Sequence, residues 1–211
     1  MIVEGVGSKA PQQIQVKLSR HEMLTVLDVA KQRAEFRQYK ARADLWGQGI
    51  KDGIEVDGLG IIERDVRPIF CGTLGEYAIQ RWLTSRLAGC VELDTELRQH
   101  GDYGVDLKAY GLSMQVKTRQ NNERVSLIRH TTENGRRIPC PWYAACFCEW
   151  TGGSVIYLVG WQWRSFIEKI VPTYGRAGGW MNVEVLDEQT LPMQRLASEL
   201  ETWRYAHQCR S

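Results

Sequence analysis

The sequence predicts an α/β fold in which a mixed β-sheet is flanked by helices, and three observations support this prediction. Three segments carry apolar residues at helical spacing. Two pairs of apolar segments are each joined by a short glycine-containing turn, as in β-hairpins. The chain has 211 residues, of which 43% are hydrophobic and 25% charged, as is typical of a globular domain with a sizeable core. The order helix, helix, hairpin, hairpin, short helix, strand, helix therefore predicts a sheet covered by helices.

The first helix is expected over residues 19–43. Ser19 and Glu22 have the Ser-x-x-Glu spacing of a capping box, which marks a helix start. Residues 47–68 are rich in glycine and aspartate and predict a connector. We therefore assign residues 1–68 to an N-terminal helical arm and connector, and residues 69–211 to a core that ends in a helix.

The second helix is expected over residues 73–88, and Gly89 is placed to terminate it. Glu76 lies three residues before Ile79 and seven before Leu83, so the carboxylate shares their inward-facing stripe. Burying a charge without a partner is costly. Glu76 therefore either extends to the helix edge or points into a site.

The strands follow in the second half of the chain. A first hairpin is expected from residues 103–110 and 112–118, and a second from residues 142–150 and 155–163. Residues 164–170 predict a short helix, residues 181–186 a strand, and residues 191–207 a last helix that begins with Pro192.

The first hairpin gathers polar side chains. A two-residue turn at Tyr110 and Gly111 sets a register in which Asp106 lies opposite Gln115. Because side chains alternate along a strand, Lys117 shares the face of Gln115 and Asp106. A shift of one residue in the register would separate them. The intervening residues, Leu112, Met114 and Val116, would face the core.

An acid, an amide and an ammonium on one face suit metal-assisted hydrolysis of phosphodiesters. Hard divalent cations prefer oxygen ligands, which Asp106, the Gln115 amide and the Val116 carbonyl can supply. Glu76 would add a second carboxylate if its end of the helix faces the hairpin. Lys117 would orient a water molecule and stabilise charge that develops on the phosphoryl oxygens. The alternative is a surface salt bridge between Asp106 and Lys117, with Gln115 incidental.

These residues resemble the core motif of the PD-(D/E)XK, or restriction-endonuclease-like, nucleases. The motif reads Val105-Asp106 followed by Gln115-Val116-Lys117. The helix of residues 72–83, with Glu76, resembles the helix that carries a glutamate in that superfamily. Residues 157–163 and the short helix after them are similar to the fourth strand of phage and prokaryotic members. The resemblance covers residues 70–170, with Val105 in place of a proline and Gln115 in place of the usual acid, as in the Gln-x-Lys branch.

The resemblance implies a Mg²⁺- or Mn²⁺-dependent deoxyribonuclease, endo or exo, of a phage or prokaryote, acting in DNA processing, repair or recombination. Its catalytic residues would be Glu76, Asp106, Gln115 and Lys117, and Val116 would contribute a carbonyl to the metal. Arg119 and Arg124 follow the motif and are candidates for phosphate contacts, although the basic stretch over residues 117–137 also fits a solvated loop. DNA is the implied partner, and a homodimer is compatible because two strands need two sites. The alternative is a catalytically inactive nuclease-fold protein that binds DNA or a host protein, and RNA as the substrate stays open.

The remaining features point to a cytoplasmic protein. The N-terminus lacks a basic start followed by an apolar run, and no stretch of about 18 apolar residues predicts a membrane span. The six cysteines have no framework or zinc-ligand spacing, so we expect free thiols in or near the core, in a bacterial or phage-infected host cytosol.

Overall fold

The computed structural model describes residues 14–36, 54–56, 58–63, 66–89, 91–95, 105–120, 125–129, 142–172, 174–175 and 181–208. The helices are α1 (Arg20–Phe36), α3 (Arg67–Thr84), α4 (Arg164–Ile167), the 3₁₀-helix η2 (Asp187–Gln189) and α5 (Met193–Gln208). The strands are β1 (Ile14–Lys17), β2 (Ile54–Val56), β3 (Gly60–Ile62), β4 (Val91–Leu93), β5 (Leu107–Ala109), β6 (Leu112–Arg119), β7 (Val125–Arg129), β8 (Ala144–Glu149), β9 (Val155–Trp163), β10 (Tyr174–Gly175) and β11 (Met181–Leu186).

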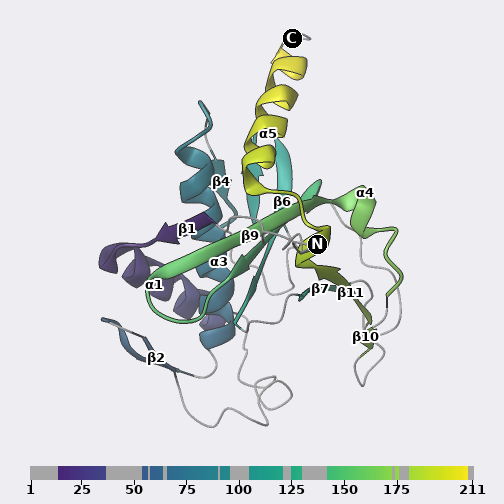
Figure 1. Cartoon of the computed structure of the whole chain (residues 1–211). Coiled ribbons are helices and arrows are strands. Elements are labelled where there is room, and N and C mark those ends of the chain that lie inside the picture. The colour runs from purple at the N-terminus through teal and green to yellow at the C-terminus, as the bar shows by residue number, and fades with distance from the viewer. Residues whose placement is uncertain are drawn as a thin grey trace, which may run out of the picture.

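A six-stranded mixed sheet forms the centre of the molecule (Figure 1). Its strand order is β1-β9-β8-β6-β5-β4, and β6 and β8 are parallel while the other neighbours are antiparallel. A second sheet has the order β10-β11-β7, and β2 and β3 form a separate hairpin. The mixed α/β class predicted from the sequence is therefore confirmed.

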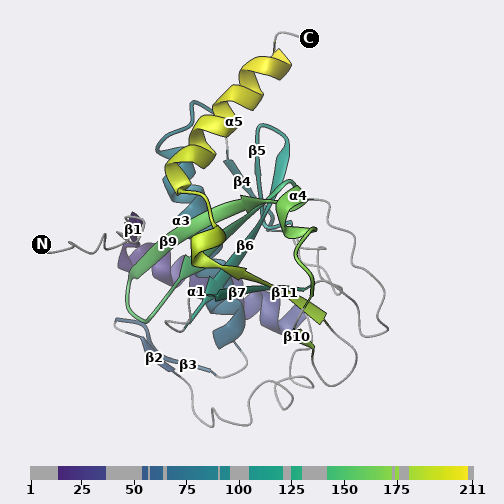
Figure 2. The ribbon, with the colours of Figure 1, turned by 45° about the vertical axis from the view of Figure 1, so that its right-hand side comes forward.

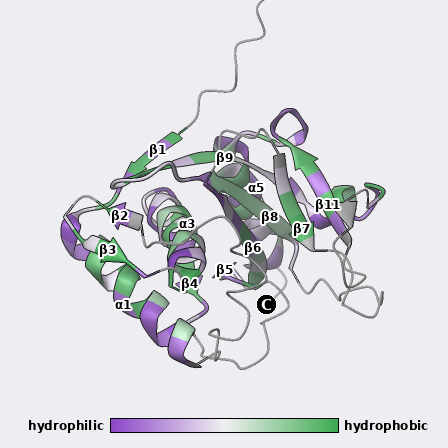
Figure 3. Ribbon diagram, turned by 90° about the horizontal axis from the view of Figure 1, so that it is seen from below, coloured by the Kyte–Doolittle hydropathy of each residue, from purple (hydrophilic) through white to green (hydrophobic). Residues whose placement is uncertain are grey.

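The two faces of the central sheet are covered differently (Figure 3). Helices α1 and α3 lie on one side of β6, β8 and β9, and strands β7 and β11 lie on the other. The larger core cluster lies on the helical side and includes Phe70 and Leu74 of α3 and Met114 of β6. The smaller cluster lies between the sheets and includes Phe147 of β8 and Val183 of β11. Each face of β6 therefore meets a different environment.

Helix α3 starts earlier and ends earlier than residues 73–88. Pro68 occupies its first turn, where a missing N–H costs nothing, and Ile69 and Phe70 extend the buried stripe towards the N-terminus. The helix approaches β6 closely at Gly75, where a Cβ atom would overlap the hydroxyl of Thr118. This close contact fixes the position of α3 along the direction of strand β6.

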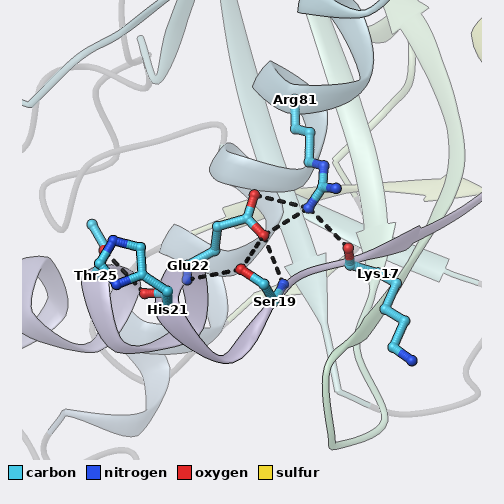
Figure 4. A network of polar contacts seen from close by, with 6 residues as sticks. All are labelled: Lys17, Ser19, His21, Glu22, Thr25 and Arg81. Carbon is cyan, nitrogen blue, oxygen red and sulfur yellow. Dashed lines mark hydrogen bonds and ion pairs between the residues drawn. The ribbon is translucent and has the colours of Figure 1, made fainter.

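The capping box at the start of α1 is confirmed. The backbone N–H of Ser19 donates to the Glu22 carboxylate at 2.6 Å, and the backbone N–H of Glu22 donates to the Ser19 hydroxyl at 3.3 Å. Arg81 of α3 donates to the same carboxylate at 2.7 and 2.8 Å and to the carbonyl of Lys17 at 2.9 Å (Figure 4). The cap therefore also ties α1 to α3. Residues 37–43 of the predicted helix lie outside the described residues.

Residues 14–36, which belong to the predicted N-terminal arm, contribute to the main core. Strand β1 pairs with β9 at the edge of the central sheet. Met23 and Val26 of α1 are buried in the same cluster as Phe70. Short strands in the predicted connector, β2 and β3, were not expected from the sequence.

The predicted hairpins are present. Tyr110 and Gly111 have φ values of 50° and 80°, as a two-residue type I′ turn requires. Strands β8 and β9 form the second hairpin, and β9 and β11 span the predicted residues 155–163 and 181–186. Helix α5 follows, with Leu196 and Leu200 buried, and runs past the end of the sheet near β5 (Figure 2). None of the helices in the described ranges is both long and apolar enough to cross a membrane.

Candidate functional site

The register of the β5–β6 hairpin is the predicted one. Leu107 pairs with Met114, and Ala109 pairs with Leu112. Beyond Leu107 the ladder changes, because the Asp106 N–H donates to the carbonyl of Met114 at 2.9 Å. The Asp106 carboxylate accepts the N–H of Val116 at 2.6 Å. Asp106 therefore replaces a backbone acceptor at the point where the two strands separate.

Gln115 and Lys117 point away from α3. Val116 and Thr118 lie next to Gly75 of α3, so alternation directs Gln115 and Lys117 to the opposite face of β6. Gln115 is only 7% exposed, and its amide oxygen has no hydrogen-bond partner in the part of the chain that the structure describes. Buried acceptors are normally satisfied, and this oxygen is one of six buried side-chain polar atoms without a partner among the described residues.

Lys117 is half-buried. No ion pair joins it to Asp106 or to another of the described residues. The surface salt bridge that the sequence left open is therefore not formed. The ammonium lies two residues after Gln115 on the same strand face, as predicted.

Glu76 is buried, with 8% of its surface exposed, and it has a cationic partner. Arg33 of α1 donates to the Glu76 carboxylate at 2.8 Å, to the hydroxyl of Thr73 at 3.0 Å and to the carbonyl of Asp94 at 2.8 Å. The N–H of Asp94 donates in turn to the carbonyl of Asp106 at 2.9 Å. Arg33 and Asp94 therefore connect Glu76 to the backbone of Asp106.

The structure thus places the predicted site residues in two groups. Glu76 lies on the helical side, in contact with Arg33, while Gln115 and Lys117 project from the other face of β6. Asp106 stands between them, where β5 ends and Val116 contributes its N–H.

Arg119 forms ion pairs with two acidic residues of neighbouring elements. Its side chain is 8% exposed and donates to Glu149 at 2.7 Å and to Asp187 at 2.6 Å. Burial lowers the pKa of Arg119, but the hydrogen bonds and charges of Asp187 and Glu149 outweigh this effect and raise it above its usual value. With its guanidinium held by two carboxylates, Arg119 joins β6 to β8 and to η2, so we do not count it among the phosphate contacts. Arg124 lies outside the described residues.

Three cysteines are buried free thiols, as expected. Burial raises the pKa of Cys71 to about 12. Burial and the nearby negative charge of Asp106 raise the pKa of Cys146 to about 12, and burial also raises the pKa of Cys148. Cys90, Cys140 and Cys209 lie outside the described residues.

No group of three or more His, Cys, Asp or Glu side chains within the described ranges is arranged to hold a metal ion. The predicted donor set contains only two carboxylates, Glu76 and Asp106, with an amide and a main-chain carbonyl as the others. All of these donors are oxygens, which hard cations prefer.

Sequence reasoning missed Arg33 and Asp94. Arg33 follows Val26 by seven residues and Ala30 by three, so it lies on the stripe by which α1 contacts the core. Glu76 was identified because it is a charged residue on the apolar stripe of its helix. The same criterion, applied to α1, identifies Arg33. Asp94 acts through its backbone, which no residue pattern predicts.

No known family model, curated protein or solved structure matches this chain.

Proposed function

We propose that the protein is a metal-dependent deoxyribonuclease that hydrolyses phosphodiester bonds beside Asp106, where β5 begins next to β6. The observation that carries this proposal is the hairpin itself. Its register brings Asp106 to the point where the strands separate, beside a strand that carries the buried oxygen of Gln115 and the ammonium of Lys117, neither of which has a side-chain partner among the described residues.

The residues present fit Mg²⁺ or Mn²⁺ in their donor chemistry. The Gln115 oxygen is buried and without a partner among the described residues, which is the state expected of a ligand atom whose cation is absent. Asp106 would hold the cation together with this oxygen and the carbonyl of Val116, and Glu76, whose Oε2 accepts a hydrogen bond from Arg33, would add a second carboxylate. When bound, a divalent cation neutralises charge on a phosphate and lowers the pKa of a water ligand.

The protein's own residues would then carry out the remaining tasks. Lys117 would donate hydrogen bonds to the phosphoryl oxygens, where negative charge develops during hydrolysis, and would orient the attacking water. Asp106 keeps β5 attached to β6 through the N–H of Val116, which fixes the distance between the acid and the Gln115–Lys117 pair. The smaller core includes Ala145 and Phe147 of β8, which pair with Gln115 and Lys117.

The order of elements supports the same assignment. Helix α3 with Glu76 precedes the hairpin, and β8, β9 and the short helix α4 follow it. This order agrees with the resemblance to PD-(D/E)XK nucleases that the sequence suggested. DNA processing, repair or recombination in a phage or prokaryote is the role implied.

A second candidate is a catalytically inactive relative of such nucleases that binds DNA or a host protein. Two observations favour it: Glu76 is held by Arg33 at 2.8 Å, and position 115 carries a neutral amide in place of a charged ligand. Such a protein would bind its partner equally well with and without a divalent cation.

Cleavage of supercoiled plasmid and of labelled single-stranded DNA, in Mg²⁺, Mn²⁺ or EDTA, separates the two candidates. We expect cutting in Mg²⁺ or Mn²⁺, none in EDTA, and none by Asp106→Asn, whose amide still accepts the N–H of Val116. Lys108→Ala is the matched control, because Lys108 is an exposed lysine of the same hairpin outside the site. A folded wild type that binds these DNAs but cuts neither in any metal would contradict the nuclease and support the binding protein.

A further inference from the structure

Arg33 and Glu76 form a buried charged pair between α1 and α3. Their side chains are 11% and 10% exposed, and their closest atoms are 2.8 Å apart. Each lies on the stripe by which its helix contacts the core, three residues after Ala30 in α1 and three before Ile79 in α3. Leucine or methionine would fit the pattern of either stripe.

Stability alone does not account for this pair. Removing two charges from water costs free energy that the attraction between them offsets only when the geometry is good, and apolar pairs of similar volume are often at least as stable. The second ion pair between the two helices, Arg81 with Glu22, is much more exposed, at 50% and 35%. It ties α1 to α3 at a smaller desolvation cost.

We propose that Arg33 is a positioning residue that holds Glu76 in the metal-free protein and releases its carboxylate when a divalent cation binds beside Asp106. This inference rests on the proposed function. It adds that the metal ion replaces the Arg33 guanidinium as the partner of the Glu76 carboxylate. The strength of the Arg33–Glu76 contact therefore influences the metal affinity of the site.

The charges of the site support an exchange. Because Gln115 is neutral, Glu76 and Asp106 are the only two carboxylates of the predicted donor set, so a cation beside Asp106 and the guanidinium of Arg33 would compete for Glu76. In the metal-free protein the guanidinium of Arg33 provides the compensating charge for Glu76, which is otherwise costly to bury.

The other contacts of Arg33 lower the cost of its release. Its guanidinium also donates to the hydroxyl of Thr73 and to the carbonyl of Asp94, at 3.0 and 2.8 Å. These acceptors remain when Glu76 turns away, so the guanidinium keeps hydrogen bonds in the pocket. Asp94 also contacts the Asp106 backbone, so Arg33 and the predicted metal ligand share a neighbour.

Binding of Mn²⁺ alone, measured by calorimetry and by the shift in Tm that Mn²⁺ produces, tests the exchange without an activity assay. Arg33→Met should bind Mn²⁺ about tenfold more tightly than the wild type, because Mn²⁺ no longer competes with the guanidinium. Its Tm should rise more with Mn²⁺ than that of the wild type. Arg33→Lys, which keeps the charge, should stay close to the wild type.

Two further variants connect the effect to Glu76. Glu76→Gln should bind Mn²⁺ about tenfold more weakly than the wild type. The double variant with Arg33→Met and Glu76→Gln should bind Mn²⁺ as weakly as Glu76→Gln alone. Arg81→Met is the matched control, because it removes the exposed α1–α3 ion pair and should leave Mn²⁺ affinity unchanged. If Arg33→Met does not fold, Glu76→Gln carries the test, since its amide still accepts a hydrogen bond from Arg33.

The outcomes separate the inference from the proposed function. Mn²⁺ binding that is lost in Asp106→Asn but unchanged in Arg33→Met and Glu76→Gln overturns the exchange and leaves the nuclease proposal intact. A wild type and an Arg33→Met variant that both fail to bind Mn²⁺ overturn the exchange and the proposed metal site together.

Discussion

At the scale of single residues, Asp106 has two roles that can be separated. Its carboxylate accepts the N–H of Val116 at 2.6 Å, which is a structural task, and its charge is the feature that a cation requires. Asparagine keeps the acceptor and removes the charge, whereas alanine removes both.

Asp106→Ala should therefore lower the free energy of unfolding by about 1–3 kcal/mol, because the buried N–H of Val116 loses its acceptor. Asp106→Asn should cost clearly less, and both variants should lose the metal-dependent activity. Urea unfolding of the three proteins measures the difference. Equal losses of stability in the two variants would show that the hydrogen bond to Val116 contributes nothing.

The residue scale is also where the sequence was most informative. The turn at Tyr110 and Gly111 fixed the register, because both residues adopt positive φ, and strand alternation then placed Gln115 and Lys117 on one face. The contacts of Glu76 and Arg119 were not predictable, because their partners lie far away along the chain, in Arg33 and Asp187. A sequence pattern shows that a buried charge needs a partner, but not which residue supplies it.

At the scale of elements, the contact between α3 and β6 sets the height of Glu76 relative to the hairpin. A Cβ atom at Gly75 would overlap the hydroxyl of Thr118 and lie 3.3 Å from a methyl carbon of Val116. A Cβ atom at Gly72, one turn earlier in the same helix, would meet nothing within 4 Å.

These two glycines form a matched pair for an experiment. Gly75→Ala should destabilise the protein by about 1–3 kcal/mol, because α3 or Thr118 must move. Gly72→Ala should stabilise it by about 0.5–1 kcal/mol, because alanine favours the helix and finds open space. Thermal unfolding measures both, and a Gly75→Ala protein as stable as Gly72→Ala would contradict the close packing of α3 on β6.

The long elements were predictable and the short ones were not. Strand β9 is a long apolar run and helix α5 carries an apolar stripe, and both matched their predicted positions closely. Strands β2, β3 and β4 contain three residues each, too few for a two-residue period to stand out. Strand β1 was missed for a related reason, since its four residues pair with β9, which lies far along the chain.

At the scale of the whole molecule, α1 is joined to α3 by an exposed and a buried ion pair, and the exposed one makes stability depend on pH. Partial burial raises the pKa of Glu22, but hydrogen bonds from Ser19 and the charge of Arg81 outweigh it and lower the pKa below its usual 4.5. A carboxyl with a lowered pKa in the folded state stabilises the protein above its unfolded pKa and loses this contribution as the pH falls.

The stabilisation by Glu22 should therefore be complete above about pH 4.5 and decline below it. Glu22→Gln should be less stable than the wild type at pH 7, and the gap should narrow as the pH falls towards 3. Thermal unfolding of both proteins across this range measures the gap. A gap that stays constant or widens at low pH would contradict the ion pair with Arg81 and the capping role.

The central claim is that the hairpin is a hydrolytic site, and the rate of DNA cleavage by Lys117→Ala under single-turnover conditions tests it most directly. With Mn²⁺ and saturating DNA, we expect this variant to cut about a hundredfold more slowly than the wild type, with DNA affinity and fold unchanged, and Lys108→Ala to cut at the wild-type rate. Cleavage by Lys117→Ala at the wild-type rate would contradict the assignment of this hairpin as the catalytic site.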